Sequence, residues 1–243
     1  VIFEFDTLKL LMKTINIKSS RHIKLMVLIA FSVHMSSCVT HLDTSNDLYT
    51  YQTNDPNGIG KWYMGREIAS VMGFEGMEWL ERPEREAEEN ASTLLKNMNI
   101  KSQDTIADIG AGSGYHVFRM TPKAAKGLIY AVDIQKEMLS KIESRKINGR
   151  TPNIEIILGS EKSTNLPENT VDKIILVDVY HEFNYPYEMM QSIKKALKPN
   201  GEVFLIEYRG EDFRVPIKEI HKMTEKQAIK EMKAVGFKLK QNI

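Results

Sequence analysis

Three glycines at alternate positions, with an acid just before them, have the residue types and spacing of a nucleotide-type binding loop. Gly110, Gly112 and Gly114 follow a short apolar run that contains Asp108 near its end. Such a run predicts a buried central strand, and the glycines allow a tight turn with the backbone in contact with a ligand. The helix expected after the turn directs its positive N-terminal end at that ligand. Alone, the pattern indicates a nucleotide-type site and nothing finer.

A second acid narrows the interpretation. Residues 127–132 predict another buried strand, which ends at Asp133, about 20 residues after the glycines. A carboxylate at this place can accept hydrogen bonds from both ribose hydroxyls of a nucleoside. The first loop reads Asp-x-Gly-x-Gly-x-Gly rather than the Gly-x-Gly-x-x-Gly of dinucleotide folds. Together these residues resemble motifs one and two of the class I S-adenosylmethionine-dependent methyltransferases, with a dehydrogenase-type loop or a chance glycine turn as the alternatives.

The resemblance implies S-adenosyl-L-methionine as the cofactor and methyl transfer as the reaction. In that family the glycine loop faces the methionine part of the cofactor, and the second acid holds the ribose. The cofactor-binding residues implied in this way are Asp108, Gly110, Ala111, Gly112, Gly114, Asp133, Ile134, Ser160, Glu161 and Asp178. Asp108 is expected to orient the loop or meet the cofactor's amino group, and Ile134 to pack on adenine. Where the family often has Gly-Asp-Ala after the third strand, this chain has Gly-Ser-Glu, so Ser160 or Glu161 would contact adenine, with a plain loop as the alternative.

The predicted fourth strand ends beside three residues that could act on a methyl acceptor. The family places acceptor-binding residues at this point, so the resemblance implies Asp178, His181 and Glu182 as the catalytic residues. Asp178 would lie near the transferred methyl group, and His181 is the candidate general base because imidazole titrates near neutral pH. Glu182 would orient the histidine or bind substrate, and a histidine that only hydrogen-bonds a loop is the alternative. No metal site is predicted: His181, Glu182 and His221 have suitable types but lack a ligand spacing such as His-x-x-x-His.

The composition gives no support for a nucleic-acid acceptor. The 243 residues carry a net charge of +1, with 27% charged residues, so there is no bulk electrostatic case for a nucleic-acid partner. The family resemblance implies methyl transfer, and a lid expected over the site suits an unidentified small molecule as the acceptor. A protein methyltransferase of the isoaspartyl type, which the turn at 112–115 also resembles, and a non-catalytic S-adenosylmethionine-binding module are the alternatives. From residue 60 to the end, and most clearly at 177–189, the chain resembles an uncharacterised group of bacterial methyltransferases.

Residues 1–38 have the pattern of a leader. Five basic residues and no acid lie between residues 9 and 24, an apolar run follows at 25–33, and small residues precede Cys38, the single cysteine. This arrangement resembles a bacterial lipoprotein signal, which implies a lipid anchor at Cys38 and a place in the cell envelope, membrane-anchored or periplasmic. A cytoplasmic protein with a disordered leader is the alternative. Residues 1–11 are interpreted as lying before a translation start at Met12.

Strand and helix patterns alternate from residue 100 to the end. The expected strands are 104–109, 128–132, 154–158, 172–178 and 202–208, and the expected helices are 115–122, 135–146, 186–197 and 224–235. This alternation predicts an α/β fold with a doubly wound, mainly parallel, Rossmann-like sheet. Ligands bind such sheets at the carboxyl ends of the strands, where the glycine loop and the acids stand.

The expected organisation has four parts. They are a leader at 1–38, a linker at 39–57, a helical extension that covers the site as a lid at 58–99, and the S-adenosylmethionine-binding domain at 100–243. Within the extension, apolar spacing predicts helices at 62–73 and 83–98, and the charged run at 84–89 is interpreted as a solvated face. The methyltransferase fold closes with a sixth strand and an antiparallel seventh. Residues 236–243 supply at most the sixth, so the C-terminal strand is expected to be missing.

Overall fold

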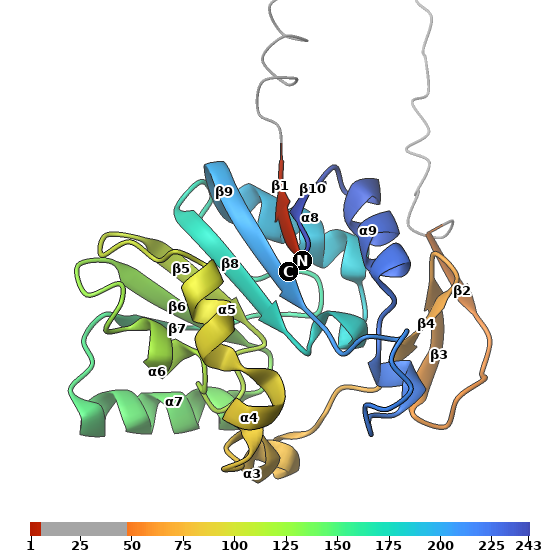
Figure 1. Ribbon diagram of the computed structural model, residues 1–243, viewed down its shortest axis with the longest axis horizontal. Helices are drawn as coiled ribbons and strands as arrows, with labels where there is room; N and C mark the ends of the chain where they lie inside the picture. The colour runs from red at the N-terminus through yellow and green to blue at the C-terminus, as the bar shows by residue number, and fades with distance from the viewer. Residues whose placement is uncertain (6–47) are drawn as a thin grey trace, which may run out of the picture.

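The computed structural model describes residues 1–5 and 48–243. The expected lipoprotein signal and the anchor at Cys38 lie outside these described residues. Figure 1 shows a large sheet with helices on both faces and a small sheet beside it. Among the described residues, no helix is long and apolar enough to cross a membrane.

Five neighbouring strands of the large sheet are parallel. They are β5 (Thr105–Ile109), β6 (Leu128–Asp133), β7 (Ile154–Leu158), β8 (Val171–Val177) and β9 (Leu197–Ile206). β5 pairs in parallel with β6 on one side and with β8 on the other, so the strand order reverses at β5. The predicted mainly parallel Rossmann-like sheet is confirmed, because apolar runs of this length are buried best as strands covered on both faces.

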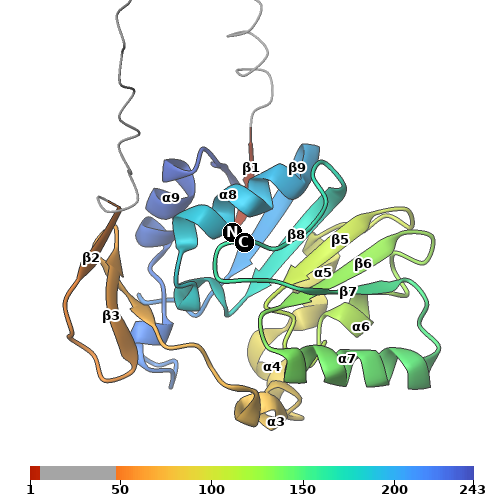
Figure 2. The same ribbon diagram turned by 180° about the vertical axis from the view of Figure 1, so that it is seen from behind.

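Helices cover both faces of this sheet. They are α6 (Val117–Met120), α7 (Lys136–Gly149), α8 (Pro186–Ala196) and α9 (Glu225–Ala234). Ile106 of β5 packs into a core with α6 and α7, whereas Ala107, on the other side of the strand, packs into a core with α8 and α9. Figure 2 shows α8 in front of the sheet, on the face hidden in Figure 1. The sheet is therefore doubly wound, as predicted.

One edge of the large sheet differs from the expectation. β10 (Lys238–Gln241) is the edge strand, and β1 (Ile2–Glu4) lies between β10 and β9, antiparallel to both. The full order is β10-β1-β9-β8-β5-β6-β7. The expectation that the C-terminal strand is missing is wrong, and so is the interpretation of residues 1–5 as part of a leader outside the fold. The physical reason is that Ile2 and Phe3 are both buried, each in the core on a different face of the sheet.

The expected helix at 62–73 is a β-hairpin instead. β3 (Gly58–Tyr63) and β4 (Arg66–Ala69) pair in antiparallel fashion, and β2 (Tyr49–Tyr51) adds a third strand within the expected linker. The turn residues Met64 and Gly65 both have positive φ, 51° and 91°, as type I′ hairpin turns require. A short apolar run fits helix or strand spacing, and here the turn decides between them.

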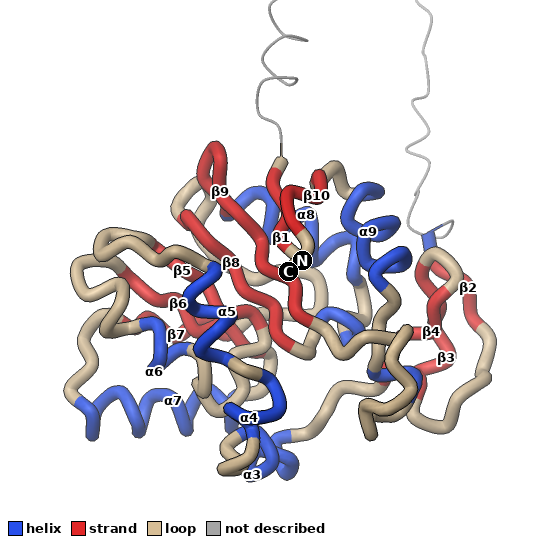
Figure 3. Tube along the Cα trace, in the orientation of Figure 1, coloured by secondary structure: helices blue, strands red, loops and turns tan. Residues whose placement is uncertain are grey.

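Short helical turns replace the rest of the expected helical extension. They are η1 (Phe74–Gly76), α3 (Met77–Leu80), α4 (Arg85–Glu89) and α5 (Ala91–Asn97). The expected single helix at 83–98 is broken at Asn90, which has a φ of 51° and whose side chain accepts a hydrogen bond from Thr93 N to begin α5. Figures 1 and 3 show α3 and α4 next to the carboxyl ends of the parallel strands. Two further 3₁₀ turns, η2 (Tyr180–Glu182) and η3 (Glu219–His221), follow β8 and β9 in the chain.

Candidate functional site

A cavity of about 490 Å³ opens at the carboxyl ends of β5, β6 and β8. Its walls come from the glycine loop after β5, the end of β6, the segment after β8 and the residues between β4 and α4. This is where the strand order reverses, the place at which doubly wound sheets bind ligands. The predicted site residues that line it are Asp108, Gly110, Ala111, Gly112, Asp133, Ile134, Asp178, His181 and Glu182.

Two glycines of the loop line the cavity and the third does not. Gly110 and Gly112 have φ values of 72° and 53°. A Cβ on Gly112 would lie 2.7 Å from Leu80 Cδ1, and one on Gly110 would overlap a side chain of the segment after β8. Gly114 lies instead against the ring of Phe118, where a Cβ would come within 2.9 Å. The structure thus gives Gly114 a part in packing the turn rather than in the cavity wall.

The carboxylate of Asp133 is held in place by two backbone donors. Its Oδ2 accepts a hydrogen bond from Gly112 N, and its Oδ1 accepts one from Gln135 N, both at 2.9 Å. Burial raises the pKa of this carboxyl above its usual value, although the backbone donors act in the opposite direction. The neighbouring Ile134 is 42% exposed and lines the same cavity. A fixed carboxylate beside an open apolar side chain suits a ribose joined to a flat base.

Asp108 has an oxygen that is free to bind a ligand. The residue is only 2% exposed, and its Oδ2 has no hydrogen-bond partner among the residues that the structure describes. Burial raises the pKa of Asp108 to about 7, with Arg85 acting to lower the pKa and Asp133 to raise it. An unpaired acceptor of this kind, together with the glycine loop, fits a ligand that has a cationic amino group. S-adenosylmethionine carries such a group on its methionine part.

Two further side chains that the sequence did not indicate also line the cavity. Arg85 is 4% exposed, although the charged run at 84–89 predicts a solvated face, and its Nε donates a hydrogen bond to Glu89 at 2.8 Å. His116 is buried, and neither ring nitrogen has a partner in the described part of the chain. Burial, with the charges of Arg85 and Arg119, lowers the pKa of His116 to about 3, so this imidazole is neutral. In the sequence, only the position of His116, two residues after the last glycine of the loop, could have indicated that it lies at the site.

At the far end of the cavity, His181 belongs to a chain of hydrogen-bonded groups. Its Nδ1 lies 2.6 Å from Glu207 Oε2, and its Nε2 lies 3.1 Å from Nδ1 of His221. The other oxygen of Glu207 accepts a hydrogen bond from Tyr180 N at 2.8 Å. Burial acts to lower the pKa of His181, but the nearby carboxylates, Glu207 foremost, raise it above its ordinary value. Glu207 follows β9 directly, so its place at a strand end is the signal that could have indicated it.

Asp178 and Glu182 bring two more carboxyl groups beside His181. Asp178 has a positive φ of 53°, and its Oδ1 lies 3.9 Å from His181 Nδ1 with no hydrogen-bond partner among the described residues. Glu182 Oε1 accepts a hydrogen bond from Met72 N at 3.1 Å. Burial raises the pKa of each of these two carboxyls to about 7, and the charge of Glu207 adds to the effect. All three predicted catalytic residues therefore lie together.

The loop after β7 does not reach the cavity. Ser160 Oγ accepts a hydrogen bond from Ser163 N at 3.1 Å, and Glu161 Oε1 accepts one from Asn184 Nδ2 at 2.7 Å. Neither Ser160 nor Glu161 lines the cavity. The structure therefore does not place either side chain where it was predicted to contact adenine. The alternative of a plain loop fits this placement.

The segment between β4 and α4 is tied across the cavity mouth. Gln135 Nε2 donates a hydrogen bond to Met72 O at 3.0 Å, which links the segment to the start of α7. Ser113 Oγ of the glycine loop donates to Glu81 Oε1, and Arg145 of α7 donates to the same oxygen, both at 2.6 Å. These contacts hold the segment over the glycine loop, where a lid is expected.

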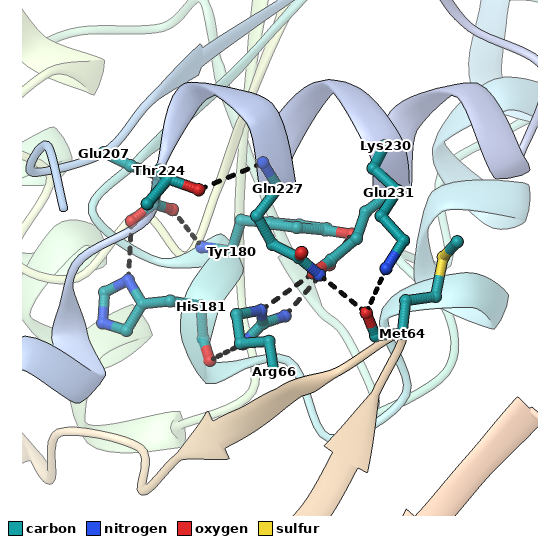
Figure 4. A network of polar contacts seen from close by, with 9 residues as sticks. All are labelled: Met64, Arg66, Tyr180, His181, Glu207, Thr224, Gln227, Lys230 and Glu231. Atoms are coloured by element: carbon teal, nitrogen blue, oxygen red, sulfur yellow. Dashed lines mark hydrogen bonds and ion pairs between the residues drawn. The ribbon is translucent and has the colours of Figure 1, made fainter. Parts of the chain in front are cut away.

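The small sheet holds the turn that carries His181, as Figure 4 shows. Arg66 Nη1 donates a hydrogen bond to the carbonyl oxygen of His181 at 2.9 Å, and Arg66 Nε donates to Glu231 of α9 at 3.0 Å. Glu231 is fully buried and also accepts from Tyr180 Oη at 2.8 Å and from Gln227 Nε2 at 2.7 Å. The network thus connects the hairpin, η2 and α9, and it fixes where η2 presents its side chains.

Comparisons with known proteins match this geometry. Residues 107–205 match the family described as a methyltransferase domain. The uncharacterized methyltransferase YdaC of Bacillus subtilis is 28% identical over 143 residues, which cover 59% of this chain and 76% of that protein. The tRNA U34 carboxymethyltransferase of Pseudoalteromonas atlantica is 31% identical over 102 residues, which cover 41% of this chain but only 30% of that protein. A solved structure, a SAM dependent methyltransferase from Aquifex aeolicus, shares the fold with a TM-score of 0.65 at 23% identity, covering 68% of this chain and 89% of that one.

The matched region and the cavity coincide. Residues 107–205 contain the glycine loop, Asp133 and the segment from Asp178 to Glu182, which form most of the cavity wall. The reversal of the strand order at β5 and the unpaired Oδ2 of Asp108 lie in this same region. Sheet topology, cavity and family match lead to one conclusion: this chain carries a class I S-adenosylmethionine-dependent methyltransferase domain.

Proposed function

We propose that the domain methylates a small molecule that binds beside His181. The observation that carries this proposal is that one cavity contains both the nucleoside-type wall at Asp133 and the cluster around His181. A methyl donor and an acceptor held in one enclosed space can be aligned for in-line transfer, which is the main contribution that a protein makes to this reaction. The cover formed by residues 71–85 favours a small acceptor over a macromolecule.

In the proposed complex, each part of the cofactor meets a residue suited to it. Asp133 accepts hydrogen bonds from the ribose hydroxyls, and Ile134 packs on adenine. Gly110 and Gly112 let the backbone approach the methionine part, whose ammonium group donates to the free oxygen of Asp108. The cofactor supplies an electrophilic methyl group on a positively charged sulfur, and the chain's own residues orient it and exclude water.

The pair of His181 and Glu207 receives the proton of an acceptor that must lose one. In the neutral ring of His181, Nδ1 donates to Glu207 and the lone pair lies on Nε2, which can act as the base. The acceptor atom then bonds to the methyl carbon as the carbon–sulfur bond breaks and its electron pair stays on sulfur. Asp178, with its free Oδ1, holds the acceptor or the cofactor at the point of transfer.

A tRNA acceptor is less well supported, although five relatives are named as tRNA U34 carboxymethyltransferases. The chain spans only 30–40% of the length of each of these relatives. Its net charge of +1 supplies no strong field for a polyanion, whereas affinity for nucleic acid depends mainly on contacts with phosphates. We therefore keep the small molecule as the proposed acceptor class.

Calorimetric titration of S-adenosylmethionine into the 243-residue chain tests the cofactor site, and the chain is used from residue 1 because Ile2–Glu4 are part of the sheet. Asp133→Asn should weaken binding at least about tenfold, since hydrogen bonds to a charged group contribute about 1.5–3 kcal/mol. Glu161→Gln, which changes a carboxyl outside the cavity, should bind as the wild type does. Equal binding by Asp133→Asn, or none by a folded wild type, would contradict the proposed site.

An acceptor screen tests the class of substrate. The chain is incubated with labelled S-adenosylmethionine and with the small-molecule, protein and RNA fractions of a bacterial extract, each separately. We expect label in the small-molecule fraction, and less of it with His181→Gln. Label found only in the RNA or the protein fraction would overturn the proposed acceptor class while leaving the cofactor site intact.

A further inference from the structure

Three donor atoms at the His181 end of the cavity have mutual distances that suit one metal ion. His181 Nε2 lies 3.1 Å from His221 Nδ1, and Glu182 Oε1 lies 3.8 Å and 3.7 Å from these two nitrogens. We propose that His181, Glu182 and His221 bind a divalent transition-metal ion such as Zn²⁺ or Fe²⁺. An ion about 2.1 Å from each donor, the usual metal–nitrogen distance, fits at the centre of a triangle with these sides.

The donor set is one that proteins use for such ions. Two imidazoles and one carboxylate, with further positions open, are typical of catalytic zinc and non-haem iron sites. His181 and Glu182 come from η2 and His221 comes from η3, so the set forms only in the fold and shows no sequence spacing. All three residues line the cavity, and the open positions of the ion therefore face the space for the acceptor.

The surroundings of His181 support a ligand role. Metal-binding histidines commonly donate their second ring nitrogen to a carboxylate, which fixes the ring and leaves the other nitrogen unprotonated. Glu207 Oε2 accepts from His181 Nδ1 at 2.6 Å, and Tyr180 N holds the other oxygen of Glu207. The same contact rules out Nδ1 as the ligand atom, so the ion belongs on Nε2, between the two histidines.

A buried divalent cation also accounts for the charges at this end of the cavity. Three carboxyl groups, Asp178, Glu182 and Glu207, surround His181, and Asp178 Oδ1 has no hydrogen-bond partner among the described residues. Within this cluster, His181 and His221 can each contribute one positive charge at most, and only when protonated. An ion between His181 and His221 places two positive charges at the centre of the cluster.

The ion gives the acceptor a chemical class, and this step rests on the proposed methyl transfer, whereas ion binding itself does not. An acceptor with a thiol, phenol or similar group that coordinates the ion loses its proton to water more readily. The resulting anion bonds to the methyl carbon, and the electron pair of the broken carbon–sulfur bond stays on sulfur. In the metal-loaded protein, coordination replaces proton transfer to His181, which is then a ligand rather than the base.

Metal binding is measured on the 243-residue chain after removal of bound ions with a chelator. Zn²⁺ is titrated by calorimetry, the bound metal is counted by mass spectrometry, and Co²⁺ absorption reports the coordination. We expect one ion at this site, lost or weakened at least about 100-fold in His221→Gln and in Glu182→Gln. Glu207→Gln, which alters only the partner of a ligand, should weaken binding about 10–100-fold. Glu219→Gln, an exposed acid on the same η3 turn, is the matched control and should bind as the wild type does.

Each outcome decides the proposal. If the folded chain binds no ion here, or if His221→Gln and Glu182→Gln bind as well as the wild type, the site is overturned and the 3.1 Å contact is a hydrogen bond between two histidines. Binding of S-adenosylmethionine is measured on the same samples. Loss of metal binding with cofactor binding intact contradicts only the metal site, whereas loss of cofactor binding with metal intact contradicts only the proposed function.

Discussion

Asp108 and Asp178 each keep a buried carboxyl oxygen without a partner among the residues described. Leaving a buried acceptor unpaired costs a folded protein about 1–3 kcal/mol. Both residues face the same cavity, one near the glycine loop and the other beside His181. In the proposed complex, the cofactor or the acceptor pairs with these oxygens, and we expect this pairing to favour binding.

Binding of S-adenosylmethionine should strengthen as the pH rises through about 7. Burial raises the pKa of Asp108 to about 7, with Arg85 lowering it and Asp133 raising it. Below that pH the carboxyl is neutral and attracts a cationic amino group less, so the dissociation constant increases by up to about tenfold per pH unit. Titration calorimetry at pH values on either side of 7 measures the effect.

Asp108→Asn separates this carboxyl from the other titrating groups. The variant should bind weakly at every pH, with a nearly flat profile across the same range. If Asp108→Asn kept the full pH dependence of the wild type, the titrating group would be another one in the cavity and the assignment of Asp108 would fail.

The sequence predicted those site residues that stand next to a motif. The glycine spacing located Asp108, and strand ends located Asp133 and His181. A strand end could have indicated Glu207, but the contacts that Glu207 and His221 make with His181 depend on how β9 and η3 pack against η2, which no local pattern in the chain shows. Likewise, nothing in the spacing of charges distinguishes a buried Arg85 from a solvated one.

At the scale of elements, the hairpin of β3 and β4 acts as a support for η2. Arg66 is the only residue of the hairpin that Figure 4 shows hydrogen-bonded to both the His181 turn and α9. Its partner Glu231 has no exposed side-chain surface. A charge buried so completely depends on its counter-ion, because desolvation makes an unpaired charge costly.

Replacing Arg66 with methionine should therefore destabilise the fold strongly. The change leaves Glu231 buried without its cation, and breaking such a pair costs about 3–5 kcal/mol in the free energy of unfolding. Denaturation by urea, followed by circular dichroism, measures the loss.

The double variant Arg66→Met/Glu231→Gln is the matched control. It should recover a large part of the lost stability, because glutamine carries no charge and can still accept the hydrogen bond from Tyr180. A single Arg66→Met variant as stable as the wild type would show that this network does not hold the hairpin.

The apolar spacing of residues 62–73 could not predict that they form the β3–β4 hairpin. Residues 62–73 fit a helix about as well as a hairpin, and the difference lies in Met64 and Gly65, which adopt a turn with positive φ. By contrast, the helices α7 and α8 follow clear periodic runs and match their predicted positions within three residues at each end. The local sequence determines the secondary structure of long periodic segments, whereas that of short segments depends on what they pack against.

In the whole molecule, β1 is the element with the least local support. It has three residues, and it lies in the large sheet between β9 and β10, which are far from it in the chain. Its stability comes from burial of Ile2 and Phe3 and from pairing on both sides. No pattern in three residues could predict this, and the alternation of strands and helices that predicted the rest of the sheet does not extend to it.

Phe3→Ala should lower the free energy of unfolding by about 3–5 kcal/mol, as truncation of a fully buried aromatic side chain does. Phe213→Ala, at a position that is 88% exposed, is the control and should change stability by less than about 0.5 kcal/mol. Thermal and urea unfolding of the 243-residue chain measure both effects. Equal stability of the two variants would mean that β1 is not part of the sheet in solution.

The pairing of Ile2 with Phe204 also determines the order in which the sheet can assemble. The four strands from β5 to β8 join partners across shorter stretches of chain, and closing a long loop costs more entropy than closing a short one. We therefore expect β1 to dock after the central strands have paired. Until it docks, the edge of β9 presents unpaired backbone groups, with which a strand of another chain can pair.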